Sequence, residues 1–223
     1  MKQANSLPTS TIVLLIRHGQ TPTTGKVLPG RTPGLHLAKA GEEQAKDVAQ
    51  RLDGLDLQAI YASPMERAQE TAAPSSASNG LEIQLHQGLI ECDFGEWTGQ
   101  NLTELNKLEE WKEVQHSPST FRFPAGESFV EMQERMLRAV AEIAHKHRGG
   151  VVAAFSHADT IKAVVASYLG TGLDHFQKVH VDTASISAVE FSGENGESAR
   201  MLVTNSRTGS LAYLRPKELD PKA

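Results

Sequence analysis

The most constraining feature of the sequence is a run of five aliphatic residues, 12–16, that leads directly into Arg17, His18 and Gly19. An apolar run of this length that ends at a turn is typical of a strand buried on both faces of a sheet. Open α/β folds bind their ligands at the carboxyl ends of such strands. The sequence therefore places a permanent cation beside a titratable imidazole at a ligand-binding edge, and this pair suits chemistry on a phosphate.

A second strand is expected to end in the same way. Residues 151–155 are apolar, and Ser156 and His157 follow them. If the two strands are parallel, His18 and His157 lie at the same edge and can face one ligand. A neutral imidazole can attack phosphorus to form a covalent intermediate, and the forked guanidinium of arginine matches phosphoryl oxygens.

The rest of the chain alternates between helical and strand patterns, which predicts an α/β fold with a mostly parallel sheet. Helical spacing of apolar residues is clearest over 38–52 and from Phe129 to 149–150. Residues 102–123 are expected to hold a short helix and a turn. Further helices are expected from Ser63 to 75–80 and after His157, with strands over 12–16, 59–62, 81–85, 151–155, 185–191 and 200–204.

Composition limits the classes of protein that need to be considered. The chain has 223 residues and no linker-like segment, which predicts one domain over 1–223 with a loose N-terminal arm at 1–10. A formal net charge of −5 argues against nucleic-acid binding. Apolar stretches are too short for a membrane span or a signal peptide, and the single cysteine, Cys92, fits a reducing compartment. We therefore expect a cytoplasmic protein.

Ser63 and Pro64 are expected to begin a helix that carries Arg67 in its first turns. Serine is a preferred N-cap, proline fits the first helical position, and Glu66 completes a capping-box pattern. Helix N-termini offer N–H donors to anions, and the helix after His157 offers the same at Ala158.

A phosphate ester also needs a proton donor for its leaving oxygen, and Glu91 is the first candidate. It lies in the loop 88–99, which is rich in acidic and aromatic residues. Apolar neighbours and a nearby phosphate would both raise the pKa of Glu91, as a general acid requires. Asp93 and Glu96 lie in the same loop and stay open as alternatives.

Four segments together resemble the signature blocks of the histidine phosphatase superfamily, the phosphoglycerate mutase-like clan; they are 15–21, 63–72, 89–99 and 155–158, within a match over about 12–214. The resemblance implies a three-layer α/β/α fold with a mostly parallel sheet of six strands, and neither a metal nor another cofactor. It also implies that His18 is the phosphorylated nucleophile and Glu91 the acid/base. Arg17, Arg67 and His157 would then form the phosphate pocket.

Further phosphate- or substrate-binding candidates surround these blocks, namely Gln20, Thr21, Thr24, Gly30, Arg31 and Ala158. Thr24 stands six residues after the nucleophile, where many members of the superfamily carry an asparagine that contacts the phosphate. Its hydroxyl would substitute only in part. Arg31 follows a Pro-Gly turn and could reach a second anionic group. Substrate specificity is expected to come from 19–37 and 102–123.

These observations predict a metal-independent phosphomonoester hydrolase that forms a phosphohistidine and acts on a small phosphorylated metabolite, with no nucleic-acid or membrane partner. A homodimer stays open. A bisphosphate-primed phosphoglycerate mutase-type phosphomutase is the alternative. Glycolytic mutases carry a longer insertion with an arginine pair, whereas no two arginines are adjacent between Glu91 and His157. A non-catalytic phosphate-recognition module is a second alternative, although such a module needs neither His18 nor Glu91.

Overall fold

Six strands form a single sheet in the computed structural model, which describes residues 10–193, 196 and 198–214. The strands are β1 (Thr11–Arg17), β2 (Leu57–Ala62), β3 (Ile83–Leu85), β4 (Val151–Ser156), β5 (Ile186–Ser192) and β6 (Ser198–Ser206). Their order across the sheet is β3-β2-β4-β1-β5-β6. β1 to β4 run parallel to one another, while β5 is antiparallel to both of its neighbours. The predicted mostly parallel sheet is confirmed.

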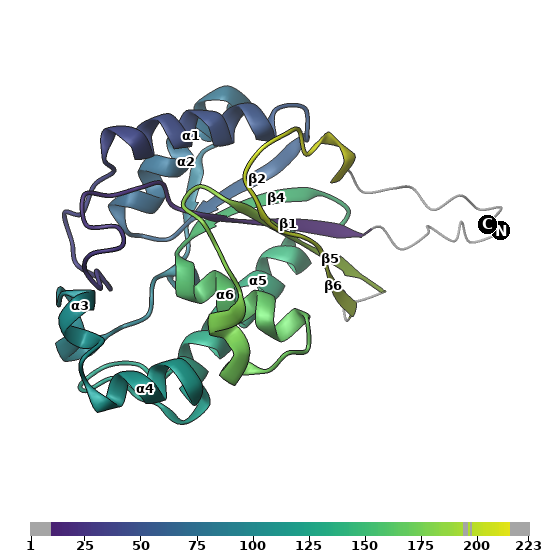
Figure 1. The fold of residues 1–223 in the computed structure, drawn as a ribbon. Coiled ribbons are helices and arrows are strands. Elements are labelled where there is room, and N and C mark those ends of the chain that lie inside the picture. Colours follow the sequence, from purple (N-terminus) through teal and green to yellow (C-terminus); the bar gives the residue numbers. More distant parts are fainter. Residues whose placement is uncertain (1–9, 194–195, 197, 215–223) are drawn as a thin grey trace, which may run out of the picture.

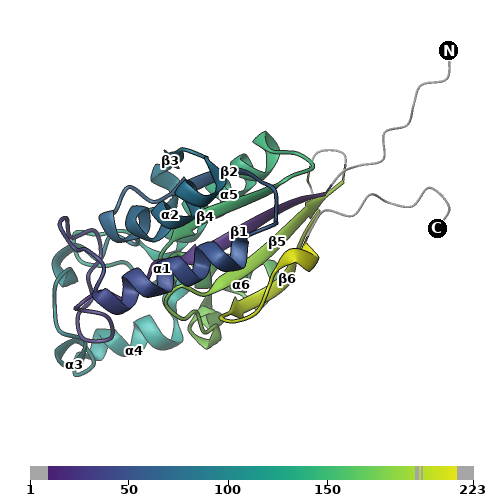
Figure 2. The ribbon, with the colours of Figure 1, turned by 90° about the horizontal axis from the view of Figure 1, so that it is seen from above.

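Helices cover both faces of this sheet, so the predicted three-layer arrangement is also confirmed (Figures 1 and 2). The helices are α1 (Lys39–Leu52), α2 (Glu66–Asn79), α3 (Leu102–Leu105), α4 (Glu109–His116), α5 (Phe129–Lys146) and α6 (Ala158–Tyr168). α1 and α2 lie on one face, and α5 and α6 lie on the other. α3 and α4 lie beyond the carboxyl ends of the parallel strands, on the side of α5 and α6.

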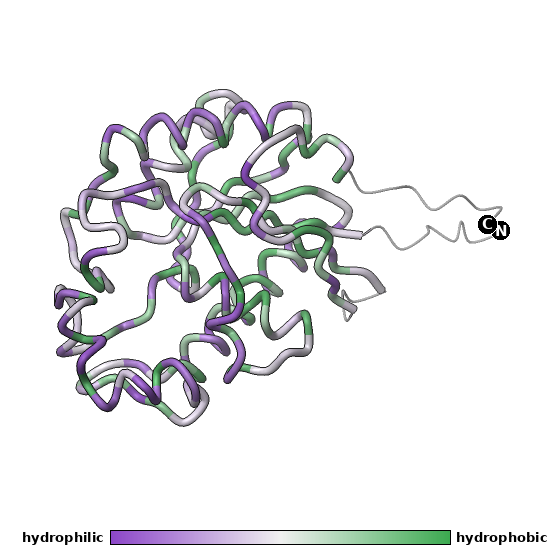
Figure 3. The backbone as a smooth tube through the Cα atoms, viewed as in Figure 1, coloured by the Kyte–Doolittle hydropathy of each residue, from purple (hydrophilic) through white to green (hydrophobic). Residues whose placement is uncertain are grey.

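β1 explains why the layers assemble around one strand. Successive side chains of a strand point to opposite faces, so Leu14 packs with Val48 of α1 while Leu15 packs with Val140 of α5. All residues from 12 to 16 are buried. Figure 3 shows this apolar centre, with hydrophobic strands between helices that are hydrophilic on their outer sides. Each fully buried aliphatic side chain contributes about 1.5–3 kcal/mol to folding.

The central pairing of β1 with β4 brings the two predicted strand ends together. Arg17 is the register partner of Ser156, and His18 donates its backbone N–H to the Ser156 carbonyl at 3.0 Å. His18 and His157 therefore leave the sheet side by side. This placement is a direct consequence of the parallel register.

The capping box predicted at Ser63 is wrong. α2 begins at Glu66, and its N-cap, Met65, makes no side-chain cap hydrogen bond. Ser63 Oγ lies 2.7 Å from His157 Nε2, and a Glu66 oxygen accepts the N–H of Gly34 at 3.0 Å. A buried imidazole needs a polar partner. The Ser63 hydroxyl therefore bonds to His157 and does not cap α2.

The segment 102–123 also differs from its prediction, because it contains two helices, α3 and α4, and a short 3₁₀ turn at Pro118–Thr120. α3 and α4 each bury one residue, Leu105 and Val114 respectively. One buried residue per helix leaves no periodic pattern in the sequence. The loose arm expected at residues 1–10 lies, apart from residue 10, outside the described residues.

No helix in the described part of the chain is both long enough and apolar enough to cross a membrane.

Candidate active site

The two histidines at the ends of β1 and β4 form the centre of the candidate site. His157 is the N-cap residue of α6. The ring centroids of His18 and His157 lie 5.2 Å apart, with the planes inclined by 61°. His18 is 5 % exposed and His157 is fully buried.

Local hydrogen bonds fix the protonation of His18. Its Nδ1 lies 2.7 Å from the carbonyl of Gly19. A carbonyl only accepts, so Nδ1 carries the proton of the neutral ring and Nε2 keeps its lone pair. Burial lowers the pKa of His18 well below its ordinary value, and the charges of Arg67 and Arg17 lower it further. His18 is therefore a neutral imidazole with a free Nε2 at physiological pH.

The turn after His18 is held by a close backbone approach. The N–H of Gly19 donates to Thr71 Oγ1 of α2 at 2.9 Å. A Cβ on Gly19 would lie only 2.6 Å from the carbonyl oxygen of Gly41 at the start of α1. Glycine is therefore required where the loop crosses α1.

Two arginines lie beside His18 with part of their donor capacity unused. Arg17 donates from Nη1 to the Val181 carbonyl at 2.7 Å, and Arg67 donates from Nη2 to the Gly30 carbonyl at 2.8 Å. Among the described residues, the Nε of each arginine and Nη1 of Arg67 are buried without a partner. Burial lowers the pKa of both arginines, but a guanidinium keeps its charge.

His157 contributes a further unpartnered nitrogen. Ser63 Oγ accepts the N–H of Met65 at 3.3 Å and can donate its own proton to His157 Nε2. The neutral ring then carries its proton on Nδ1, which is buried and has no partner within the described structure. Burial, followed by the charge of Arg67, lowers the pKa of His157 well below its ordinary value.

Glu91 is the buried carboxyl of the site. It is 5 % exposed, and its Oε1 accepts the N–H of Cys92 at 2.9 Å. Burial raises its pKa to about 7, and the charge of Asp159 acts in the same direction. The Cys92 N–H and the charges of Arg67 and Arg17 oppose this rise. Glu91 can therefore hold a proton near neutral pH.

The two alternative carboxylates lie elsewhere. Asp93 accepts the N–H of Gly95 at 3.0 Å and pairs with Arg31 at 3.4 Å, with its side chain 41 % exposed. Glu96 is exposed. Neither residue lines the cavity, whereas Glu91 lines it together with His18.

A cavity of about 300 Å³ opens in front of His18. Of the residues expected from the sequence, it is lined by Arg17, His18, Thr21, Thr24, Glu91 and Ala158. Arg67 and His157 are fully buried next to His18 and are not among the lining residues. The cavity is also lined by apolar and polar side chains that the sequence did not predict for the site. They are Phe94, Trp111, Val114, Phe123 and Phe129, and Asp159, Lys162 and Gln177.

Of the other binding candidates, Thr24 lines the cavity, whereas Gln20, Gly30 and Arg31 do not. Thr24 Oγ1 accepts the N–H of Thr21 at 2.8 Å, so it shapes the loop that lines the cavity. The exposed Gln20 binds Gln44 through its backbone N–H. Gly30 holds Arg67 through its carbonyl. Arg31 does not line the cavity, and all three of its nitrogens contact protein oxygens.

Sequence reasoning missed several residues of the cavity wall. Lys162 lies one turn beyond Asp159 on α6 and donates to it at 3.2 Å, a spacing that could have revealed the pair. Gln177, His180 and Val181 come from a segment with no recognisable pattern. Trp111 stacks on Trp97, with the ring centroids 6.0 Å apart, and also lines the cavity.

Within residues 10–193, 196 and 198–214, no group of three or more His, Cys, Asp or Glu side chains is arranged to hold a metal ion. The charges that act on His18 are those of Arg67 and Arg17.

The fold and these strand ends define a protein of the phosphoglycerate mutase-like class, and comparison with known proteins identifies the family. The chain belongs to the histidine phosphatase superfamily (branch 1), whose sequence model matches residues 13–204. The resemblance seen in the sequence is confirmed. Proteins similar to this chain are phosphatases or phosphomutases of this superfamily.

Three similar proteins illustrate the activities named among these relatives. Phosphoserine phosphatase 1 of Hydrogenobacter thermophilus is 29% identical over 182 residues, which cover 79% of this chain and 85% of that protein. Probable phosphoglycerate mutase GpmB of Escherichia fergusonii is 28% identical, with coverage of 93% and 97%. A phosphoserine phosphatase from Entamoeba histolytica in complex with 3-phosphoglyceric acid has a TM-score of 0.77 at 25% identity, with coverage of 88% and 97%.

Proposed function

We propose that the protein is a metal-independent phosphomonoester hydrolase that acts on a small phosphorylated metabolite through a phosphohistidine at His18. One observation carries this proposal. In the described part of the chain, four buried nitrogen atoms without partners belong to Arg17, Arg67 and His157, the two cations that act on His18 and the imidazole that packs against it. Buried polar groups are normally satisfied, and a phosphoryl group would supply the missing acceptor oxygens.

In the first step, His18 Nε2 attacks phosphorus in line and the bond from phosphorus to the ester oxygen breaks. Arg17, Arg67 and His157 stabilise the charge on the phosphoryl oxygens. The carboxylic acid of Glu91 gives its proton to the leaving oxygen, so the alcohol departs neutral. The products of this step are phosphohistidine, an alcohol and the Glu91 carboxylate.

In the second step, water attacks the phosphohistidine. The Glu91 carboxylate takes the proton of the attacking water, and the bond from phosphorus to Nε2 breaks. Inorganic phosphate leaves, and both side chains return to their initial protonation states. The positive end of α6 at Ala158 stabilises the anion throughout.

The test is phosphate release from a panel of phosphorylated metabolites and from phenyl phosphate, with and without a chelator. We expect turnover that the chelator does not change. The same assay with 3-phosphoglycerate, with and without 2,3-bisphosphoglycerate, separates a hydrolase from a primed mutase. Isomerisation faster than phosphate release would overturn the hydrolase assignment, and absence of any turnover would favour a phosphate-recognition module.

The pKa of about 7 for Glu91 predicts a pH limit on the first step. The acid form is required, so kcat/KM for phenyl phosphate falls as the pH rises through about 7, while His18 stays neutral across this range because its pKa is lowered. In Glu91→Gln, kcat/KM is expected to fall by about 10²–10³-fold, and its decrease with rising pH is expected to disappear. If this variant keeps the wild-type kcat/KM and its dependence on pH, Glu91 is not the general acid, and Asp93 and Glu96 become the candidates.

A further inference from the structure

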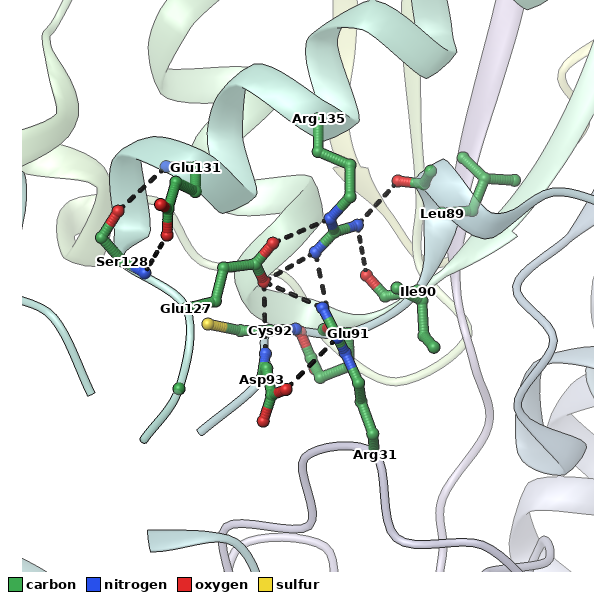
Figure 4. A network of polar contacts seen from close by, with 12 residues as sticks. Arg31, Leu89, Ile90, Glu91, Cys92, Asp93, Glu127, Ser128, Glu131 and Arg135 are labelled. Carbon is green, nitrogen blue, oxygen red and sulfur yellow. Dashed lines mark hydrogen bonds and ion pairs between the residues drawn. The ribbon is translucent and has the colours of Figure 1, made fainter. Parts of the chain in front are cut away.

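An ion network surrounds the backbone of the loop that carries Glu91 (Figure 4). Glu127, just before α5, binds Arg135 through both oxygens at 2.9 Å. It also accepts from Arg31 Nη2 at 3.0 Å and from the backbone N–H of Asp93 at 3.2 Å. The Glu127 side chain is only 13 % exposed. One carboxylate thus joins two arginines that are distant in the sequence.

Both arginines donate hydrogen bonds to backbone carbonyls of the loop that carries Glu91. Arg135 Nη1 donates to the carbonyls of Gly88 and Ile90, each at 2.9 Å. Arg31 Nε donates to the Glu91 carbonyl at 2.9 Å, and Arg135 Nη2 approaches the same oxygen at 3.4 Å. Here the chain has only short 3₁₀ turns, Gln87–Leu89 and Gly95–Trp97. The guanidinium groups therefore supply hydrogen bonds to the carbonyls of this loop, as a neighbouring strand does within a sheet.

We propose that Glu127, Arg31 and Arg135 are positioning residues that fix Glu91 against the leaving oxygen of the substrate. The inference rests on the proposed function, because it assumes that Glu91 is the general acid. It gives Arg31 a role other than the anion contact expected from the sequence.

The adjacency of Gly30 and Arg31 shows how this network connects the acid to the phosphate pocket. The Gly30 carbonyl holds the guanidinium of Arg67, while Arg31 holds the Glu91 carbonyl. One turn therefore sets the distance between a phosphate-binding cation and the proton donor. An error of about 1 Å in such a distance costs on the order of 10²-fold in rate.

Stability alone is a weak reason for this network. Largely buried ion pairs often contribute no more than apolar residues of similar size, because both charges must lose water. Guanidinium forks fix carbonyl and carboxylate oxygens in defined directions. The network is thus better suited to holding a geometry than to adding stability.

Leaving-group dependence tests this role in Glu127→Gln. Phenolate is a poor leaving group that needs protonation, whereas 2,4-dinitrophenolate departs without it. The ratio kcat/KM reports the steps up to and including the first irreversible one, which here is the loss of the leaving group. We expect kcat/KM to fall by about 30-fold for phenyl phosphate and by less than about threefold for 2,4-dinitrophenyl phosphate. Glu134→Gln, a matched change at an exposed position on α5, is expected to leave both values unchanged.

A double-mutant cycle with Glu91→Gln makes the test specific. If Glu127 acts through Glu91, Glu127→Gln adds nothing to the loss already caused by Glu91→Gln on phenyl phosphate. Equal losses on both substrates, or additive losses in the double variant, would overturn the inference. Arg31→Lys keeps the positive charge but loses the forked guanidinium. If Glu127→Gln does not fold, the same two substrates and the same cycle with Glu91→Gln are measured in Arg31→Lys. A wild-type protein without turnover of either substrate would instead refute the proposed function.

Discussion

Replacement of His18 by alanine is expected to lower kcat for phenyl phosphate by on the order of 10⁴–10⁶-fold. The imidazole that packs against His18 is not free to take over the attack. His157, the nearest ring, has its Nε2 engaged with Ser63. The loss should be equally large for 2,4-dinitrophenyl phosphate, because a better leaving group does not replace a missing nucleophile. Initial-rate measurements on both substrates separate this pattern from that of Glu91→Gln.

The fold should survive this change. His18 is neutral in the folded protein, and within the described residues its side chain bonds only to the adjacent Gly19. The control is His145→Ala, at an exposed position near the end of α5, which is expected to keep full activity. Residual activity above a tenth of the wild-type rate in a folded His18→Ala protein would remove His18 from the role of nucleophile.

The second large effect is expected at Arg67. Arg67→Met should lower kcat/KM for phenyl phosphate by about 10²–10³-fold or more, because one buried cation that stabilises the transition state is lost. The free energy of unfolding without phosphate should change by less than about 2 kcal/mol. The reason is that Arg67 is fully buried with two nitrogens lacking partners in the described structure, a cost that methionine removes. The lost bond to Gly30 offsets part of this gain.

Thermal unfolding with and without inorganic phosphate checks this prediction. Phosphate should raise the Tm of the wild-type protein, since it binds only the folded state, and should have a much smaller effect on Arg67→Met. Arg138→Met, at an exposed position on α5, serves as the control and should behave as wild type. A Tm shift of the same size in Arg67→Met and wild type would show that phosphate binds without Arg67.

The strand ends and the layered fold could be predicted because their signals are local. The apolar run before Arg17 and the one before Ser156 each specify a doubly buried strand, and parallel pairing does the rest. Glu91 could be proposed because aromatic neighbours in the same loop signal a buried site. In these cases a short stretch of sequence contains the whole physical cause.

Contacts between distant segments could not be predicted in this way. Ser63 matches a capping pattern, yet its hydroxyl binds His157, 94 positions away. Arg31 and Glu127 are 96 positions apart, so nothing local indicates that they share an ion pair. A single sequence shows each of these residues, but it does not show which distant residue becomes its partner in the folded chain.

The most direct measurement of the central claim is rapid acid-free quenching of the protein during turnover of 2,4-dinitrophenyl phosphate, followed by intact and peptide mass analysis. The account predicts one added phosphoryl group, located on His18, labile in acid and absent in His18→Ala. A phosphoryl group on another residue, or none at a time when the first equivalent of dinitrophenolate has been released in a burst, would contradict it.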